Sequence, residues 1–551
     1  MTLHDTVRDA PFGQLMRLLF KGRVFQYPEE KADFELPAAW MDLMHHENGV
    51  PDRAASDSTP VEHSLHKGTA QADTAKDISV PTGADIESAP VEKIASHVIQ
   101  PTRTKDGIIL VDWYTTDDPA NPHNWSNLRR GLLGGIIFFY TLVVYMTSSL
   151  YTSSTPDVMQ KFGVSNLKAT LGLSIYVLGY GVGPLLFSPL SEIARIGRSP
   201  VYILTMILFA FFGSPSLASG GATMADMYSM LYLPFAMIAW VAAAFCGPAI
   251  GPIISGFAVP AENWRWSLYE SIWASSPVLI VMFFFLPETS TPTILLHRAQ
   301  RLRRLTGNNS LMAQCEIDQR HQTVSAIAVD ALIKPLEITI KDPAILFVQV
   351  YTAIVYGIYY SYFEVFPLVY GGFYGMNLGE TGLVFICITI GCLLACTAYG
   401  SLLYFVVVPQ IKKSGMGPQE GVLLPGIPAS VGPVIGLFMF AWTARESIHW
   451  IVPTIGITIY AMSVFIVFQC VFLYIPLSYA RYTSSLFAAN DFFRSALACG
   501  SVLFAHPLFN NLGVAKGVSL LGGLSVIGVI GIAALMVYGA KLRAMSKFAV
   551  S

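Results

Sequence analysis

Ionisable side chains inside long apolar stretches are the residues of this sequence with the most capacity for chemistry. Glu364 lies within YYSYFEVFPLVYGG, Glu270 follows Trp266 by about one helical turn, and Asp491 and Arg494 are three residues apart. Ionisable groups are costly inside a membrane, so they are functional candidates wherever they occur there. We therefore predict Glu364, Glu270 and Asp491 as proton-coupling residues.

Each of these residues also has a plainer interpretation. Glu364 can be a structural carboxylate that is hydrogen-bonded to a neighbouring helix, and Glu270 can be solvated near the outer surface. Asp491 and Arg494 share a helix face at a spacing of i to i+3 and can neutralise each other. For this last pair a structural ion pair is the favoured interpretation.

Aromatic residues make up 12% of the sequence and are frequent in the same apolar stretches. Aromatic rings with a few polar groups among them suit a cavity for varied apolar compounds. Many of these rings must instead face lipid or pack between helices. Our candidates for a substrate cavity are Tyr360, Phe363, Gln469 and Phe472.

The composition places the chain in a membrane. Of its 551 residues 53% are hydrophobic and 13% are charged, whereas soluble domains carry about 25% charged residues. The 34 basic and 36 acidic residues nearly cancel, so no charge excess indicates a nucleic-acid partner. Apolar runs of about 20 residues suffice to cross a bilayer. We count eleven, at 131–151, 170–190, 201–221, 234–258, 267–286, 344–368, 381–408, 421–442, 450–476, 485–508 and 517–540.

The runs divide the chain into four parts. Residues 50–106 are rich in Ser, Thr, Asp and Pro, a composition that favours disorder. Before them, residues 12–27 fit a short basic amphipathic helix on the membrane surface, or a partly ordered tail. The expected division is a cytosolic, largely disordered tail (1–106), an N-terminal helical half (107–286), a cytoplasmic central loop (287–342) and a C-terminal helical half (343–551).

The count of crossings conflicts with the charge pattern. Basic residues at 297–305 and in the C-terminal tail place the central loop and both termini in the cytoplasm. An even number of crossings must then separate the N-terminal region from the central loop, yet only five runs lie there. The run at 201–221 has to do the work of two helices. Either a segment is absent from this chain or the region is misfolded or re-entrant.

A loop between the second and third runs, FSPLSEIARIGRSPVY, puts Glu192, Gly197 and Arg198 at a helix end, where charged groups can pair across helices. It resembles the loop that latches the two halves of major facilitator proteins, and the resemblance assigns the latch to these three residues. Ser188 stands in place of Gly, Glu192 in place of Asp, and the spacing is two residues longer, as in the fungal branch. An ordinary basic turn is the alternative.

The run at 234–258 contains GPAIGPIISGF, whose glycines fall on one helix face and allow close packing. Its prolines remove helix hydrogen bonds and permit a bend. The string resembles the motif that marks antiporters of the major facilitator superfamily, although Ser255 replaces a usual Gly. The motif residues are Gly247, Pro248, Gly251, Pro252 and Gly256.

Over nearly the whole chain, the sequence resembles the fungal drug:proton antiporters of the cycloheximide- and fluconazole-resistance type. The resemblance implies an all-α integral membrane protein with two six-helix halves. It implies proton-coupled efflux of small hydrophobic compounds, such as drugs, fungicides, toxins or secondary metabolites, across the plasma membrane by a monomer. Neither a cofactor nor a metal is expected, and no enzyme motif occurs. The proton gradient is the energy source, and the partners are substrate, protons and the lipid bilayer.

Measured against that family, residues 201–209 resemble the start of the third helix and 210–221 the end of the fourth. The join removes a helix segment and with it the basic residue that such exporters carry in helix four. Three alternatives stay open, and the last of them follows from this missing segment. The chain can export a polyamine or a self-made metabolite, it can be an importer or sensor of the same fold, or it can be an inactive truncated product.

Overall fold

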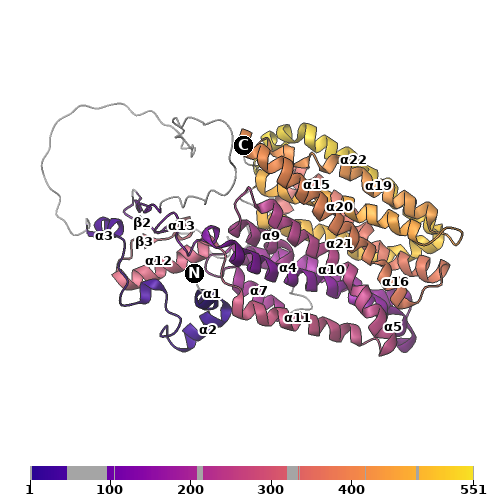
Figure 1. Cartoon of the computed structure of the whole chain (residues 1–551), viewed down its shortest axis with the longest axis horizontal. Helices are drawn as coiled ribbons and strands as arrows, with labels where there is room; N and C mark the ends of the chain where they lie inside the picture. Colours follow the sequence, from indigo (N-terminus) through magenta and orange to yellow (C-terminus); the bar gives the residue numbers. More distant parts are fainter. Residues whose placement is uncertain are drawn as a thin grey trace, which may run out of the picture.

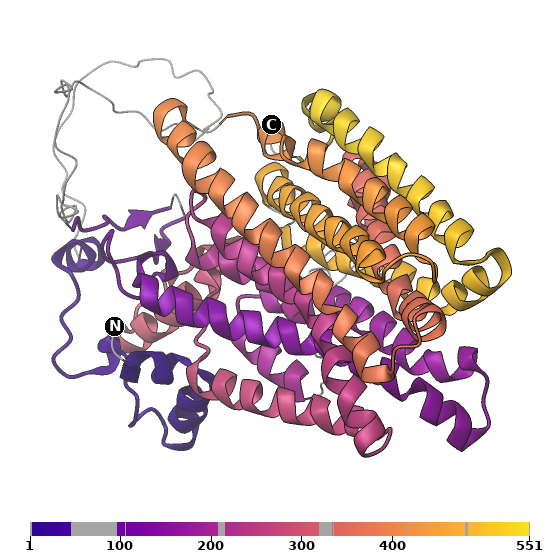
Figure 2. The same ribbon diagram turned by 45° about the vertical axis from the view of Figure 1, so that its right-hand side comes forward.

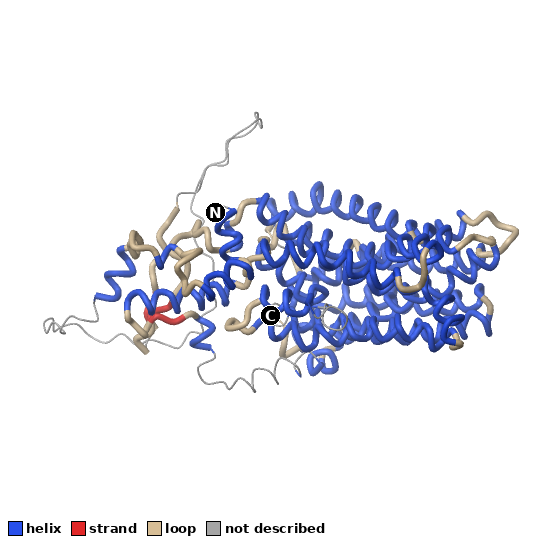
Figure 3. The backbone as a smooth tube through the Cα atoms, turned by 90° about the horizontal axis from the view of Figure 1, so that it is seen from below, coloured by secondary structure: helices blue, strands red, loops and turns tan. Residues whose placement is uncertain are grey.

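The computed structural model describes residues 3–45, 96–104, 106–207, 215–318, 333, 336–415, 417–479 and 483–549. Long helices run side by side along the long axis of the molecule, and the few strands lie at one end of it (Figure 3). The N-terminal helices and the helix α12 (Thr291–Thr306) gather at that same end (Figure 1). We call this the α12 end and the opposite one the α16 end.

The bundle consists of two groups of helices, which are coloured purple to magenta and orange to yellow in Figures 1 and 2. The first group contains α4 (Asn127–Leu150), η3 (Tyr151–Ser154), α5 (Thr155–Phe162), α6 (Asn166–Glu192), α7 (Arg198–Ile207), α9 (Pro215–Met227), α10 (Leu233–Ala261) and α11 (Trp266–Phe285). The second contains α15 (Pro343–Phe366), η4 (Pro367–Phe373), α16 (Leu378–Val384), α17 (Ile386–Leu402), η5 (Leu403–Val407), α18 (Val408–Ser414), η6 (Gln419–Leu423), α19 (Gly426–Thr443), α20 (Ile451–Ser478), α21 (Thr483–Leu512) and α22 (Val514–Met545).

Ten helical stretches among the described residues are long and apolar enough to cross a membrane. They correspond to ten of the eleven predicted runs. Local sequence sets where they begin. Ser126 accepts a hydrogen bond from the amide of Arg129 at the start of α4, and Asp342 accepts from Ala344 and Ile345 at the start of α15. Such caps satisfy amides that lack partners within the helix.

The predicted single span at 201–221 is wrong. The structure has two short helices there, α7 of 10 residues and α9 of 13. At 1.5 Å per residue these are about 15 Å and 20 Å long, whereas the hydrocarbon core is about 30 Å thick. Residues 208–214, where the two predicted helix fragments meet, lie outside the described residues.

The two short helices form an antiparallel pair. Arg198 Nε lies 2.6 Å from Asp226 Oδ2, and the hydroxyls of Tyr202 and Thr223 are 2.8 Å apart. The residue numbers rise along α7 while those of their partners fall along α9. The chain therefore enters and leaves this hairpin on the same side, which removes the conflict over the number of crossings.

Helix α10 packs closely on α4 because two of its glycines face the α4 backbone. A Cβ at Gly247 would lie 2.8 Å from the carbonyl oxygen of Leu142, and one at Gly251 would lie 2.8 Å from that of Met146. Close approach of helix backbones is how helices associate in lipid, where hydrophobic burial offers little gain. The glycines of the antiporter-type motif are thus packing positions.

The α12 end carries a small polar-rimmed unit, in which strands β1 (Thr102–Arg103), β2 (Ile109–Leu110) and β3 (Leu311–Met312) form one sheet. Arg298 of α12 holds Asp118 through two hydrogen bonds of 2.6 and 3.2 Å. Residues assigned above to a tail also have structure here. They form α1 (Leu3–Asp9), α2 (Pro11–Leu19), η1 (Pro28–Glu30) and α3 (Ala38–His45), while residues 46–95 lie outside the described part. The remaining elements are η2 (Pro122–Asn124) and α13 (Gln314–Asp318).

A side chain at position 251 should force α10 away from α4. We expect Gly251→Val to lower stability by about 1–3 kcal/mol through overpacking. Gly135→Ala is the matched control, because a Cβ at Gly135 on α4 meets nothing within 4 Å. The measurement is thermal unfolding of the purified protein in detergent, and equal melting temperatures for the two variants would contradict this packing.

Asp118 and Arg298 should keep the unit at the α12 end folded at neutral pH. Burial raises the pKa of Asp118, but the hydrogen bond and charge of Arg298 outweigh it and lower that pKa below its usual value. The stabilisation is therefore present above about pH 4 and lost as the pH falls through the lowered pKa.

Asp118→Asn leaves a buried guanidinium poorly paired, which costs about 3–5 kcal/mol. Faster hydrogen exchange at residues 108–125 at neutral pH is the expected result. Asp106→Asn, at an exposed position, is the control that should exchange like the unaltered chain. No difference between the two variants would show that the pair is dispensable.

Candidate functional site

A cluster of tyrosine hydroxyls joins the two groups of helices at the centre of the bundle. Tyr180 of α6 lies 3.0 Å from the hydroxyl of Tyr356 and 2.9 Å from that of Tyr360, both on α15. Ser148 of α4 lies 2.9 Å from the Tyr360 hydroxyl. All four side chains are buried. Buried hydroxyls that bond across a helix interface fix how the two groups sit together.

A buried ion pair lies beside this cluster. Arg494 of α21 donates to Asp491 at 2.6 Å and to the hydroxyl of Tyr145 on α4 at 3.3 Å. Its guanidinium also lies over the ring of Tyr356, 4.9 Å from the centroid. Asp491 is completely buried, and its Oδ2 has no hydrogen-bond partner within the described part of the chain. The ion pair lies on α21 of the second group and contacts the first group through the hydrogen bond from Arg494 to Tyr145.

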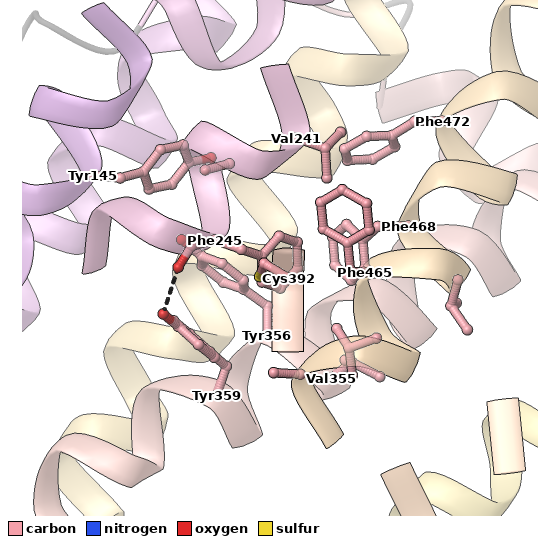
Figure 4. Packing of buried hydrophobic residues seen from close by; sticks show 14 of the residues in the cluster. Tyr145, Val241, Phe245, Val355, Tyr356, Tyr359, Cys392, Phe465, Phe468 and Phe472 are labelled. Carbon is pink, nitrogen blue, oxygen red and sulfur yellow. Dashed lines mark hydrogen bonds between the residues drawn. The ribbon is translucent and has the colours of Figure 1, made fainter. Parts of the chain in front are cut away.

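Aromatic rings of α20 lie beside α10 in the core, where Phe468 and Phe472 are near Phe245 and Val241 (Figure 4). Phe468 and Phe472 each lie with the ring centroid 5.6 Å from the Arg494 guanidinium. Phe472 packs on Trp240 of α10, with centroids 5.8 Å apart, and Phe468 packs on Phe245 of α10 at 5.1 Å. Aromatic contacts between α20 and α10 thus fill the space between the two groups.

The four predicted cavity residues lie on α15 and α20, the helices that carry the hydroxyl cluster and the aromatic layer. Tyr360 belongs to the hydroxyl cluster and Phe472 to the aromatic layer. Gln469 donates from Nε2 to the carbonyl oxygen of Met237 on α10 at 3.2 Å. Phe363 stacks on Phe385, with centroids 5.1 Å apart. The prediction that these residues bind substrate stays a prediction.

Glu364 lies apart from the ion pair, toward the α16 end of α15. Its side chain is buried and lines a cavity of about 160 Å³. Pro252 of α10 and Gly382 of α16 line the same cavity, so it sits on the seam between the two groups. A Cβ at Gly256 would lie 2.9 Å from the carbonyl oxygen of Leu378, which shows how tightly that seam is closed.

The third predicted coupling residue, Glu270, is not near these groups. It lies on α11, the least buried of the ten candidate spans. The side chain is half-buried, and its Oε2 has no hydrogen-bond partner among the described residues. The structure therefore brings Asp491 to the centre of the bundle, places Glu364 on the seam and leaves Glu270 at the periphery.

The residues of the predicted latch lie at the α12 end. Arg198 pairs with Asp226 inside the first group of helices. The Glu288 carboxylate accepts hydrogen bonds from the backbone amides of Arg198 and Ser199, both at 3.1 Å. Gly197 has a φ of +79°, which favours glycine, and a Cβ there would meet Glu288. Glu192 is the last residue of α6. A latching role for Glu192, Gly197 and Arg198 stays a prediction.

Comparison with known proteins decides the family. The model of the Major Facilitator Superfamily matches residues 207–502, which is more than half of the chain. The chain belongs to the major facilitator superfamily. It is therefore a member of a transporter family, and its fold resembles that of the proton:xylose symporter XylE. That likeness has a TM-score of 0.51 at 11% identity and covers 75% of this chain and 96% of XylE.

Among curated relatives, this major facilitator protein is 41% identical to "MFS-type transporter pyvG" of Aspergillus violaceofuscus, over 82% of this chain and 87% of that one. It is 33% identical to "Cycloheximide resistance protein" of Candida maltosa, over 98% and 99% of the two chains. The resemblance to fungal drug-resistance transporters is thereby confirmed. The second alignment runs over 577 positions although this chain has 551 residues. At least 26 positions of the alignment thus have no counterpart here.

Sequence reasoning missed several residues of the candidate site and of the network at the α12 end. Tyr145 and Tyr180 contribute the hydroxyls of the first half, and Asp226 and Glu288 complete the network around Arg198. A tyrosine in the middle of an apolar helix is a usable signal, because its buried hydroxyl needs a partner. Nothing in the sequence, however, says which helix supplies that partner.

Replacing Tyr180 with Phe should weaken the contact between the two halves of the transporter. The change removes the hydroxyl that bonds Tyr356 and Tyr360 across the halves, at about 0.5–1.5 kcal/mol for each bond. Tyr176→Phe is the control, because the Tyr176 hydroxyl donates to Val144 within one half. Distances between spin labels on α6 and α21, measured by pulsed resonance, should broaden only for Tyr180→Phe. Identical distributions for both variants would contradict the bridging role.

Proposed function

We propose that this chain exports small hydrophobic compounds across the plasma membrane and that protons moving inward drive the export. The printed name of the Candida maltosa relative, a cycloheximide resistance protein, supports a small-molecule cargo. The aromatic layer around Phe468 and Phe472 supports an apolar cargo, because flat rings can stack against it. Transport would proceed by alternating access between the two halves.

The proposed orientation places the α12 end in the cytoplasm. Arg301, Arg303 and Arg304 lie on α12, and Arg543 lies near the end of α22 at the same end of the bundle. Basic residues beside membrane helices are enriched on the cytoplasmic side. Both termini are then cytoplasmic, and the α16 end faces outward.

The observation that carries proton coupling is the position of Glu364 on the outer seam. A carboxylate that is closed in between α10 and α16 loses its hydration, so its neutral, protonated form suits the closed seam better. A proton taken from outside would favour closure of the outer gate. Its release after the halves rock would favour reopening, and each cycle then carries a proton inward.

Asp491 has a different part in this proposal. Its pairing with Arg494, and the contact of Arg494 with Tyr145, hold the two halves in register at the substrate level. The Asp491 carboxylate and the Arg494 guanidinium, 2.6 Å apart, compensate each other inside the bundle, as a structural ion pair does. We therefore place proton uptake at Glu364 and give the ion pair a positioning role.

Glu364→Gln should stop proton-coupled export, because a permanently neutral side chain favours the closed outer gate. The assay uses the full chain in proteoliposomes, with a planar fluorescent compound and an imposed pH gradient that a protonophore abolishes. Glu446→Gln, at an exposed position, is the control and should transport normally. Unchanged export by Glu364→Gln would rule out this carboxylate as the proton site.

The alternative that this chain is an inactive product also has an observation in its favour. Helices α7 and α9 are too short to span a membrane, and α11 beside them is little buried. A chain that folds but no longer transports would have these features. In that case the unaltered chain should bind substrate without moving it, and the same proteoliposomes should show no gradient-dependent flux. Transport by the unaltered chain would exclude this reading, whichever compound is used.

A further inference from the structure

Helix α2 lies at the edge of the membrane-spanning bundle. The ring of Phe12 packs on Phe283 and Phe284 of α11, with centroids 6.0 and 4.7 Å apart. Helix α11 ends at Phe285, so its contacts with α2 fall in its last turn. A helix packed against the last turn of a membrane span is held at the boundary between lipid and water.

Polar contacts with α12 fix the orientation of the segment that carries α2. Tyr27 lies between the guanidinium groups of Arg8, Arg17 and Arg301, each within 3.9–4.6 Å of its ring centroid. Arg17 also pairs with Glu30 at 2.6 Å. Arg17 is the member of this group that belongs to α2, and its contacts hold the C-terminal part of α2 beside Tyr27 and Glu30.

The C-terminal end of α2, including its C-cap Phe20, exposes apolar side chains. Leu18, Leu19 and Phe20 expose 77%, 62% and 53% of their surface. Fully burying one such side chain yields about 1.5–3 kcal/mol, so leaving several in water forgoes several kcal/mol. Lys21 and Arg23 follow directly and are exposed as well. An apolar face bordered by basic residues is typical of a helix that lies in a membrane interface.

The surface next to this face is already a lipid surface. Ile280 and Val281 of α11, one turn before the phenylalanines that Phe12 contacts, expose 58% and 41% of their area. They belong to one of the candidate membrane spans, where exposed apolar residues meet lipid. The exposed face of α2 continues that surface toward the α12 end. This continuity identifies the occupant as lipid, because the neighbouring surface has no other.

A hollow beside α2 adds to this picture. Leu15 and Leu18 share a cavity of about 770 Å³ with Ile203 and Leu204 of α7. Arg301 and His297 of α12 line the same cavity. Acidic residues line it as well, namely Asp9, Glu29, Asp118 and Glu288, so the charged part of the lining does not select an acidic headgroup. The apolar walls at Leu15, Leu18, Ile203 and Leu204 suit an acyl chain.

We propose that α2 is an interfacial helix that inserts Leu18, Leu19 and Phe20 into the leaflet at the α12 end, with Lys21 and Arg23 on acidic lipid headgroups. The partner of this surface is the bilayer itself. Through Tyr27 and Arg301 the membrane-bound helix also holds α12, the first helix after the first half. The inference depends on neither the direction of transport nor proton coupling.

The test uses the full-length protein in nanodiscs of phosphatidylcholine, with or without phosphatidylserine. A genetically encoded dansyl amino acid replaces Leu18, or Leu19 as a second site in case the first variant misfolds. Ala32, exposed in the loop after η1, is the control position. At Leu18 and Leu19 we expect quenching by nitroxides on the lipid chains and protection from iodide in the water. At Ala32 we expect the reverse.

Nitroxide-labelled phosphatidylserine should quench the Leu18 probe more than labelled phosphatidylcholine does. Lys21→Gln with Arg23→Gln should reduce this preference by up to about fivefold per charge, which corresponds to about 1 kcal/mol per basic residue. Equal access of iodide to positions 18 and 32 would overturn the proposal. Protection of position 18 from both quenchers would also overturn it, because protein rather than lipid would then cover the face.

Discussion

Lipid gives helices little reason to associate, so the bundle depends on places where backbones approach closely or buried polar groups meet. Gly247 and Gly251 let α10 lie against α4, and Gly256 lets it reach α16 in the other half. One helix thus belongs to the core of the first half and to the seam with the second. The position of α10 in turn sets where Trp240 and Phe245 meet the rings of α20.

Among the residues that the structure describes, the hydrogen bonds between the halves lie near the centre of the bundle. Arg494 reaches Tyr145, and Tyr180 reaches Tyr356 and Tyr360, all within the buried layer. A surface held by a handful of hydrogen bonds can be released without unfolding either half, since each bond is worth only about 1 kcal/mol. Tight packing at glycines and sparse bonding at tyrosines are therefore suited to different tasks. Packing at the glycines keeps each half rigid near the seam. The small number of tyrosine hydrogen bonds keeps the free-energy cost of separating the halves low.

Ten of the eleven spans were predictable because length and hydropathy suffice to identify a helix that crosses lipid. Within the run at 201–221 the two helix fragments were recognisable from the resemblance to the family, but their pairing as a hairpin was not, because it depends on contacts such as Arg198 with Asp226. For the site, Asp491 and Arg494 were recognisable from their charge alone. Tyr145 and Tyr180 were not, since their importance comes from partners about 180 to 350 residues away in the chain. A short helix within residues 12–27 was expected, and α2 lies there. The packing of residues 3–45 on α12 could not be expected, because it depends on contacts that composition does not reveal.

The short hairpin bears on how this first half could move. Arg198, Asp226 and Glu288 tie α7, α9 and the end of α11 together, but only at the α12 end. The described parts of α7 and α9 are about 15 Å and 20 Å long, and α11 is the least buried of the ten candidate spans. At least 26 positions of the alignment with the Candida maltosa relative have no counterpart in this chain. Rocking of two halves requires that each move as a rigid body. At the α16 end α11 is held by η3 instead, where the Ser154 hydroxyl bonds Ser267 and the carbonyl oxygen of Trp264. Thr152 and Ser153 of η3 line the cavity at Glu364, so in this chain η3 and α10, and not the hairpin, connect the first half to that seam.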